Sequence, residues 1–335
     1  MAPRGRETFA FLDRLRLEVR GDARALAHFR AEYRAARVDS APVPEIIVSF
    51  GRAVADSPRG FTGNYRSLRW RVALDDADDT PLRATIDLRG APRSFGLSLL
   101  QGYVVEPLLA LLAPAAGRVL LPAAAVASEE GALLLLGRSR SGKSSLVARA
   151  AAAGTAVLGD DHVLVGADGC RAFPRRLRLY PDVAATAPTA RAALPAPTRA
   201  LLRGLGLVRR ATGGAVAPPV RIPVETVGVV YRDPLPLGRV VVLERREVPR
   251  LVAEPLSRDE LVATAGAVLQ EQRRALDAVD DARWRGLFAR VRTREESLLN
   301  DAFARVSSVE RLVVPTRLPA GESVASIAAE LSAGF

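Results

Sequence analysis

The feature that most constrains this chain is a glycine-rich segment that fits the pattern G-x-x-x-x-G-K-[ST]. It consists of Gly137, Arg138, Ser139, Arg140, Ser141, Gly142, Lys143 and Ser144. The apolar run before it, 131–136, predicts a buried strand, and the residues 143–153 after it predict a helix. We therefore expect a strand, a loop and a helix in succession, with backbone N–H groups and the helix dipole directed at a phosphate group.

Two side chains of this segment have defined roles in such a loop. The Lys143 ammonium reaches the outer phosphates of a nucleotide, and the Ser144 hydroxyl is a ligand for Mg²⁺. Ser145 follows directly and is included among the nucleotide-binding candidates. Lys143 is the only lysine among the 48 Lys and Arg residues. Because a compact ammonium fits between phosphates better than a planar guanidinium, this choice supports ATP and Mg²⁺ as cofactors.

The composition of the 335 residues argues against several other classes of protein. A single cysteine, Cys170, and two distant histidines, His28 and His162, argue against disulfide, zinc and iron–sulfur sites. The net charge of +11 comes from arginines spread along the chain and aromatic residues make up 5%, which argues against nucleic-acid binding. No uncharged apolar run reaches ~18–20 residues. We therefore expect a cytoplasmic protein without membrane contact, and a homo-oligomer stays open.

The hydropathy pattern divides the chain into three consecutive parts. Residues 1–120 predict an α+β region, and residues 121–255 predict the core that carries the glycine-rich loop. Within that core, 183–219 is rich in Ala, Pro, Arg and Gly and predicts an irregular insertion with one short helix. Residues 256–335 predict a mainly helical C-terminal region. Individual elements expected in the first part are a helix over 22–36 and strands over 45–50, 68–74 and 84–88.

A pair of aspartates, Asp160 and Asp161, follows a short predicted strand, 156–158. Asp160 lies 17 residues after Lys143, which leaves room for a helix of about three turns and a returning strand. A carboxylate beside the loop can hold Mg²⁺ or accept the proton of an attacking hydroxyl. A solvated Asp-rich turn is the alternative interpretation, and spacing alone leaves both open.

The loop and the aspartates are compatible with three functions. The first is a kinase in which one carboxylate of the pair accepts the proton of an attacking hydroxyl. The second is a P-loop ATPase or nucleotide-regulated binding protein, in which Glu244, after the apolar run 240–243, polarises the attacking water. The third is a small-molecule kinase. The aspartate pair favours the two kinases over the ATPase.

The stretch 131–165 resembles the HPr kinase/phosphorylase family and its HPr-kinase-like serine kinase relatives, some of which accompany lasso-peptide systems. The resemblance rests on GRSRSGKS at 137–144 and on Leu-Gly-Asp-Asp at 158–161, and a further similarity covers the Pro-Arg-rich segment 173–179. It implies an α/β fold with a phosphoenolpyruvate-carboxykinase-like P-loop core, an N-terminal α+β part and a helical C-terminal part. It also implies ATP-dependent transfer to a serine of a peptide or protein, with Asp160 as base and Asp161 supporting metal or substrate.

The chain departs from the family at two positions. The family's upstream histidine would fall near Pro122, and no histidine occurs between His28 and His162. The family's glutamate after the loop is Ser145 here. These departures speak against phosphorylase activity and against HPr as the acceptor. Asp182, which follows the Pro-Arg-rich segment, is the candidate for a second metal carboxylate.

Three arginines of that segment, Arg175, Arg176 and Arg178, are secondary candidates. They can clamp a phosphate or an acidic acceptor, or they can form the solvated face of a strand. His162 is expected to be a structural neighbour of the aspartates rather than a catalytic group.

Overall fold

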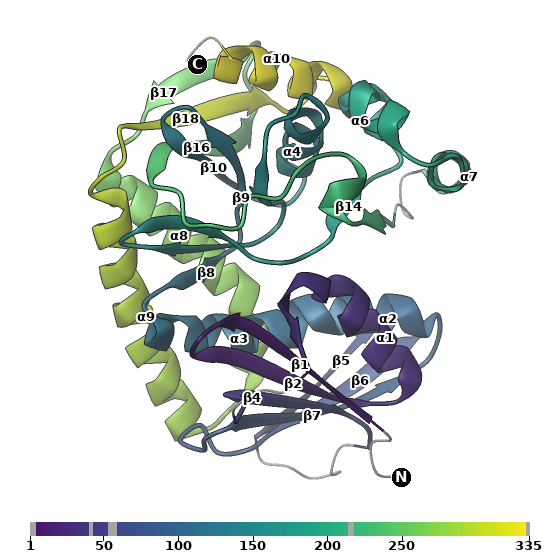
Figure 1. Ribbon diagram of the computed structural model, residues 1–335, viewed down its shortest axis with the longest axis vertical. Coiled ribbons are helices and arrows are strands. Elements are labelled where there is room, and N and C mark those ends of the chain that lie inside the picture. The colour runs from purple at the N-terminus through teal and green to yellow at the C-terminus, as the bar shows by residue number, and fades with distance from the viewer. Residues whose placement is uncertain (1–4, 40–42, 53–58, 214–217, 333–335) are drawn as a thin grey trace. The chain divides into compact units, whose positions relative to one another are not determined.

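The computed structural model describes residues 5–39, 43–52, 59–213 and 218–332 and has a mixed α/β architecture with several sheets and helices (Figure 1). The general α/β class expected from the sequence is confirmed. The chain forms two compact units and enters each of them twice, which differs from the three consecutive parts expected. Unit 1 holds the residues up to Leu120 and Leu269–Leu298, and unit 2 holds Leu121–Val268 and the residues from Leu299 onward.

Unit 1 is built on a mixed sheet with the strand order β3-β1-β2-β4-β7-β6-β5. The pairs β1–β2, β5–β6 and β6–β7 are antiparallel, whereas β2–β4 and β4–β7 are parallel. Three of these strands coincide with the strands expected over 45–50, 68–74 and 84–88, which are confirmed. The bounds are β1 (Gly5–Leu12), β2 (Leu15–Gly21), β3 (Arg37–Val38), β4 (Ile46–Phe50), β5 (Gly60–Tyr65), β6 (Leu68–Leu74) and β7 (Leu82–Arg89).

The N-terminal helix of unit 1, α1 (Ala23–Glu32), confirms the helix expected over 22–36, and the Asp22 carboxylate caps it by accepting from the N–H of Ala25 at 2.8 Å. A second helical stretch runs from Arg93 to Ala116 and is long and apolar enough to cross a membrane by length and composition alone. Its most apolar window is 67% buried, as in the core helices of folded domains. Its parts are α2 (Arg93–Leu100), η2 (Gln101–Val105), α3 (Glu106–Leu112) and η3 (Ala113–Ala116).

Helix α9 (Ala282–Phe303) brings a C-terminal segment into unit 1. Trp284 of this helix is fully buried, and its indole N–H donates to the backbone oxygen of Asp75 at 3.1 Å. Arg59 donates to Asp281, just before the helix, at 3.1 Å. Because these contacts join residues more than 200 positions apart, the local hydropathy pattern could not indicate that the helix is shared between the units.

Unit 2 is built on a sheet with the order β11-β9-β10-β16-β18-β17. Strands β10, β16 and β18 are parallel, whereas β9 is antiparallel to both β10 and β11. Strand β11 therefore runs in the same direction as β10. The bounds are β9 (Ala124–Ser128), β10 (Gly131–Gly137), β11 (Val157–Gly159), β16 (Leu237–Arg246), β17 (Val252–Pro255) and β18 (Ser308–Pro315). Two smaller sheets comprise β8 (Val119–Leu121), β12 (Val163–Gly166) and β13 (Gly169–Ala172), and β14 (Leu177–Leu179) with β15 (Val220–Ile222).

The segment 183–219 is helical over much of its length, which corrects the irregular insertion expected there; its residues 214–217 lie outside the described residues. The expectation was wrong because proline interrupts a helix only in its interior. Pro188 and Pro197 lie in the first turns of their helices, where the missing N–H removes no helical hydrogen bond. The helices are α5 (Val183–Thr186), α6 (Pro188–Ala193) and α7 (Ala196–Ala211).

The remaining helices are α4 (Lys143–Ala152), α8 (Arg258–Arg273) and α10 (Ala320–Ser332), with short turns η1 (Arg34–Ala36), η4 (Val224–Thr226) and η5 (Leu276–Ala278). Ser257 and Glu260 form a reciprocal cap at the start of α8, because the side chain of each accepts from the backbone N–H of the other. The buried face of α10 carries Val324, Ile327 and Leu331.

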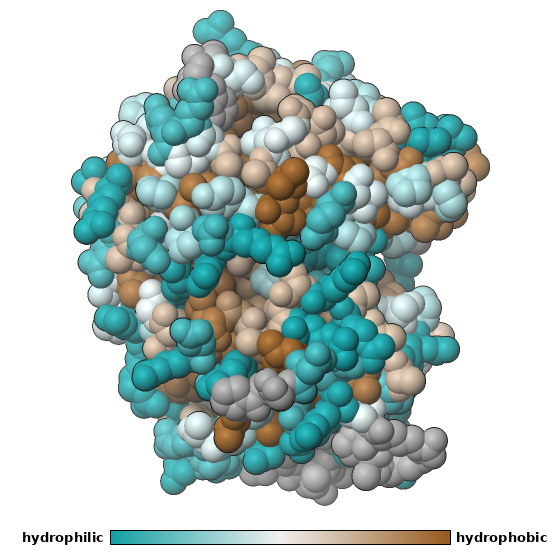
Figure 2. Space-filling view, in the orientation of Figure 1, coloured by the Kyte–Doolittle hydropathy of each residue, from teal (hydrophilic) through white to brown (hydrophobic). Residues whose placement is uncertain are grey.

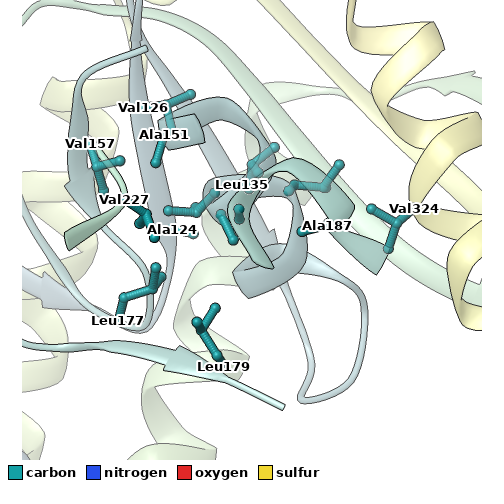
Figure 3. Packing of buried hydrophobic residues seen from close by; sticks show 14 of the residues in the cluster. Ala124, Val126, Leu135, Ala151, Val157, Leu177, Leu179, Ala187, Val227 and Val324 are labelled. Carbon is teal, nitrogen blue, oxygen red and sulfur yellow. The ribbon is translucent and has the colours of Figure 1, made fainter. Parts of the chain in front are cut away.

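A cluster of buried apolar side chains joins the main sheet of unit 2 to the helices on one of its faces (Figure 3). Ala124 and Leu135 come from the sheet, Ala151 from α4, and Val324 from α10. Leu179 of β14 belongs to the same cluster, so the start of the 183–219 segment is anchored on this core. This packing fixes α4 across the carboxyl end of β10.

Candidate functional site

The glycine-rich loop has the strand–loop–helix form that the sequence predicts. Strand β10 ends at Gly137 and α4 begins at Lys143. Gly137 has φ +150°, and a Cβ there would lie 2.6 Å from the backbone oxygen of Leu243 on β16. Gly142, directly before the helix, has φ +106°. Both glycines are therefore required by the backbone path, which turns the N–H groups at the start of α4 toward the loop.

The Lys143 ammonium lies over the loop. It donates to the backbone oxygens of Gly137 and Arg138, the latter at 3.1 Å, and approaches the Ser141 hydroxyl at 3.4 Å. Burial lowers the pKa of Lys143, and the charges of Asp161 and Asp160 act in the opposite direction. The ammonium thus lies within electrostatic range of both aspartates.

The remaining members of the loop differ in exposure. Arg138, Ser139 and Arg140 are exposed, whereas Ser141 is buried and Ser145 is half-buried. Arg140 has φ +68°, an unusual conformation for a residue with a side chain. The exposed members can contact a ligand only from the solvent side of the loop.

Sheet topology explains how Asp160 reaches the loop. Strand β11 ends at Gly159, and it runs in the same direction as β10, with β9 between them. The carboxyl ends of β10 and β11 therefore meet at one edge of the sheet, so that Asp160 faces the loop that begins at Gly137. The structure brings together Lys143, Ser144, Asp160 and Asp161, four of the residues singled out from the sequence.

Asp160 is 6% exposed and has an unusual electrostatic environment. Its Oδ2 accepts from the backbone N–H of Arg178 at 2.9 Å. Its Oδ1 is buried, and no described residue donates a hydrogen bond to it. Burial, followed by the charge of Asp161, raises the pKa of Asp160 to about 7, although interaction with the Ser144 hydroxyl opposes the rise. This carboxyl group can therefore gain or lose a proton near neutral pH.

Asp161 has the opposite character. Two arginines bind its Oδ2, Arg175 at 2.6 Å and Arg178 at 2.8 Å. Burial acts to raise the pKa of Asp161, but the charges of Arg175 and His162 outweigh it, so the pKa is lowered. The adjacent aspartates thus differ in the direction in which their pKa is shifted: the pKa of Asp161 is lowered and that of Asp160 is raised.

Arg175 and Arg178, which were secondary candidates in the sequence analysis, lie in the site. The sequence analysis did not identify two further residues that act on the aspartates, Tyr180 and Arg221. The pKa of Tyr180 is raised by burial and by the charges of Asp161 and Asp160. Arg221 acts electrostatically on Asp161, and it pairs in register with Arg178 across β14 and β15. The alternating Val-Arg-Ile at 220–222 was the available signal for β15.

Asp182, the candidate second metal carboxylate, has a different partner. Its Oδ2 accepts from Arg209 Nη1 of α7 at 2.8 Å. Within the described residues, no group of three or more His, Cys, Asp or Glu side chains is arranged to hold a metal ion. The metal role of Asp182 stays a prediction that its ion pair does not favour.

Glu244 lies on the other face of the sheet from α4. Val241 and Leu243 belong to the cluster that packs on α4, and successive strand residues point to opposite faces. The Glu244 side chain is 44% exposed and binds Arg246 at 3.3 Å and Arg311 at 3.2 Å. Glu244 and the aspartates thus form two separate clusters.

The arrangement of the aspartate cluster suits group transfer. It combines a glycine-rich loop, the cations of Lys143, Arg175 and Arg178, and one carboxyl group whose pKa lies near neutral pH. In a comparison with known proteins, no protein-family model and no curated protein sequence matches the chain.

Proposed function

We propose that the protein is an ATP-dependent kinase that transfers the γ-phosphate to a serine hydroxyl of a peptide or protein. The observation that carries the proposal is the position of Asp160, a buried carboxyl group with a free Oδ1 and a pKa of about 7, beside the glycine-rich loop. A general base works best when its pKa lies near the working pH. Asp160 meets that condition, and Asp161 does not.

The loop fits the phosphates of a nucleotide. Gly137 and Gly142 have positive φ angles, a backbone form that can direct N–H groups toward an anion, and the Lys143 ammonium lies over the same loop. Lys143 would then exchange its bonds to the loop carbonyls for bonds to the β- and γ-phosphates. The same exchange places the γ-phosphate on the side of Asp160, because the Lys143 ammonium is in range of that carboxylate.

The residues present also fit Mg²⁺. This ion keeps several waters and takes only one or two protein oxygens besides the phosphates. Ser144, beside Asp160, and Asp161 would hold it, with Arg175 and Arg178 on Oδ2 of the same Asp161 carboxylate. When bound, Mg²⁺ neutralises the charge on the transferred phosphoryl group.

The chain's own residues account for the proton and the acceptor. Asp160 Oδ1 accepts the proton of the serine hydroxyl as the serine oxygen forms its bond to the γ-phosphorus and the bond to ADP breaks. Asp161, held by Arg175 and Arg178, stays ionised and keeps these two cations beside the reaction centre. A serine acceptor, rather than a metabolite, is what the resemblance to HPr-kinase-like serine kinases implies. Glu244 supports no ATPase role, because it points to the opposite face of the sheet.

The test measures transfer of γ-labelled phosphate to serine-containing peptides by the wild type and by Asp160→Asn. We expect transfer to fall by about 10³-fold in the variant, since a general base contributes on that order. Nucleotide binding, measured by titration with a fluorescent ATP analogue, should be retained. Equal transfer by both proteins would remove the proposed base, and ATP hydrolysis that no acceptor stimulates would favour the ATPase instead.

A further inference from the structure

A groove lies beside the site, between the start of α5, α6 and α7. It has a volume of about 390 Å³. Its apolar part includes Val183, Leu202 and Leu207, and its basic part is formed by Arg191, Arg203 and Arg210. Arg191 comes from α6 and the other two arginines come from α7, so cations border the groove on two sides.

The segment that carries this positive charge contains no acidic residue of its own. Between Asp182 and Glu225 the sequence contains no acidic residue and six arginines. Arg209 pairs with Asp182, and Arg199 donates to backbone oxygens of its own segment, one of them that of Leu194 at 2.8 Å. The three arginines of the groove form no ion pair with any described residue; they are Arg191, Arg203 and Arg210.

Several large apolar side chains of α7 are exposed, although Leu202 is buried. Leu207 in the groove is 63% exposed, and Leu201 on a neighbouring face of the helix is 53% exposed. Figure 2 shows brown and teal atoms side by side at the position of α7. Exposed large apolar residues beside unpaired cations indicate a surface that binds something both apolar and acidic.

The chain connects this groove directly to the aspartates. Arg178 binds both Asp160 and Asp161, and Tyr180 lies within their electrostatic range. Pro181, the next residue, lines the groove. A chain whose serine lay at Asp160 would therefore meet the groove within a short distance.

We propose that the groove of α5, α6 and α7 binds the acceptor chain, and that it selects an extended peptide with acidic and apolar residues beside its phosphorylated serine. This proposal rests on the proposed kinase function, which it sharpens by defining the substrate class. The carboxylates of the peptide would pair with Arg203 and Arg210, and an apolar side chain would cover Leu207. A concave groove that adjoins the site fits a peptide better than the flat surface of an anionic membrane, for which a basic amphipathic helix is the other known partner.

The experiment measures binding directly, without ATP, by fluorescence anisotropy of a fluorescein-labelled peptide of Glu, Leu and one Ser. The groove variant is the double substitution Arg203→Glu with Arg210→Glu. We expect its affinity for this peptide to fall by at least about tenfold, as two lost charge pairs imply. Leu207→Ser should weaken binding by a smaller factor, since it removes only part of the apolar contact.

A matched variant controls for net charge. Arg232→Glu with Arg250→Glu changes the charge by the same amount at two exposed arginines of unit 2 outside the groove. Its affinity for the Glu peptide should stay within about twofold of wild type. A Lys-for-Glu version of the peptide should bind the groove variant better than it binds wild type, an effect that misfolding could not produce.

Three outcomes overturn the proposal: equal binding of the Glu peptide and a Gln-for-Glu peptide, equal loss of affinity in the groove and control variants, or preferential binding of phosphatidylglycerol vesicles that the groove variant abolishes. The failure of the kinase proposal would look different. Asp160→Asn should bind the Glu peptide as wild type does, whether or not phosphate transfer occurs. In the kinase assay, the groove variant should raise KM for the peptide by about tenfold and leave kcat unchanged.

Discussion

Two acidic clusters of unit 2 lie toward the carboxyl ends of strands that run in the same direction in the main sheet, and they differ in almost every physical respect. Asp160, after β11, is 6% exposed, and its pKa is raised to about 7. Glu244, near the end of β16, has a side chain that is 44% exposed and is paired with Arg246 and Arg311. One carboxyl group has a raised pKa beside the glycine-rich loop, and the other forms ion pairs with two arginines. The comparison teaches that deep burial beside a like charge, rather than acidity at a strand end, distinguishes a candidate catalytic group.

The largest expected difference between substitutions at Asp160 and at Glu244 is in the rate of phosphate transfer. Asp160→Asn keeps the size of the side chain and the acceptor for the Arg178 N–H, but it cannot accept a proton. Transfer should fall by about 10³-fold, and Glu244→Gln should leave it within about twofold. Initial rates with labelled ATP and a serine peptide measure both.

The pH profile is the internal control of this prediction. In wild type the rate should rise with pH and level off above about 7, because Asp160 must be ionised to act as the base. The residual rate of Asp160→Asn should lack this rise. A wild-type profile that is flat between pH 5 and 8 would contradict the assignment.

The second largest effect is expected on the affinity of the glycine-rich loop for ATP. Lys143→Arg keeps the charge but replaces a compact ammonium with a planar guanidinium, next to carbonyl groups of the loop that leave little room. We expect ATP affinity to fall by about 10- to 100-fold, the value of one or two charge-assisted hydrogen bonds. Titration with a fluorescent ATP analogue measures it.

Arg149→Lys is the matched control for this variant. Arg149 lies in the last turn of the same helix, α4, and the exchange is the reverse one between the same two residue types. Its ATP affinity should equal that of wild type. Loss of affinity in Arg149→Lys, or full affinity in Lys143→Arg, would mean that the ammonium is not selected by the phosphates.

The local parts of the site could be predicted from the sequence. Glycines at 137 and 142, an apolar run before them and a helix after them specify the loop without any distant contact. The spacing from Lys143 to Asp160 then allowed the return of the chain to the same edge. The pKa of Asp160 could not be predicted, because it depends on burial by elements distant in sequence.

The sequence-based predictions were wrong or incomplete where the structure depends on contacts between residues far apart in the chain. Prolines and glycines in 183–219 predicted irregular structure, yet two prolines occupy first turns and α7 runs for 16 residues. Arg221 entered the site only through the pairing of β15 with β14, across more than 40 residues of chain. Non-local strand pairing of this kind leaves little trace in a local pattern.

The third effect is on stability. A carboxyl group whose pKa is raised in the folded state binds a proton more tightly there than in the unfolded chain, so the stability it contributes falls as pH rises from about 4 to about 7. A shift from 3.8 to about 7 corresponds to about 4 kcal/mol, and repulsion shared with Asp161 reduces the part that belongs to Asp160 alone.

We therefore expect Asp160→Asn to raise the free energy of unfolding by about 2 kcal/mol at pH 8 and to leave it nearly unchanged at pH 4. Urea denaturation without nucleotide at both pH values measures the difference. A variant that is less stable than wild type at pH 8 would show that the fold favours the ionised carboxylate. That result would contradict the difference between Asp160 and Glu244 described above.

The smallest effect is expected at Glu244. Glu244→Gln removes one charge from a half-exposed network that also contains Glu254, to which Arg246 donates. Both arginines keep an acidic neighbour after the substitution, since Arg311 also lies 3.7 Å from Glu254. The free energy of unfolding should change by less than about 1 kcal/mol at pH 8, as for other solvent-exposed ion pairs, and the change should shrink further in high salt. A loss of several kcal/mol, or a salt-independent loss, would mean that Glu244 is as constrained as Asp160, so that only position relative to the glycine-rich loop would still distinguish the two clusters.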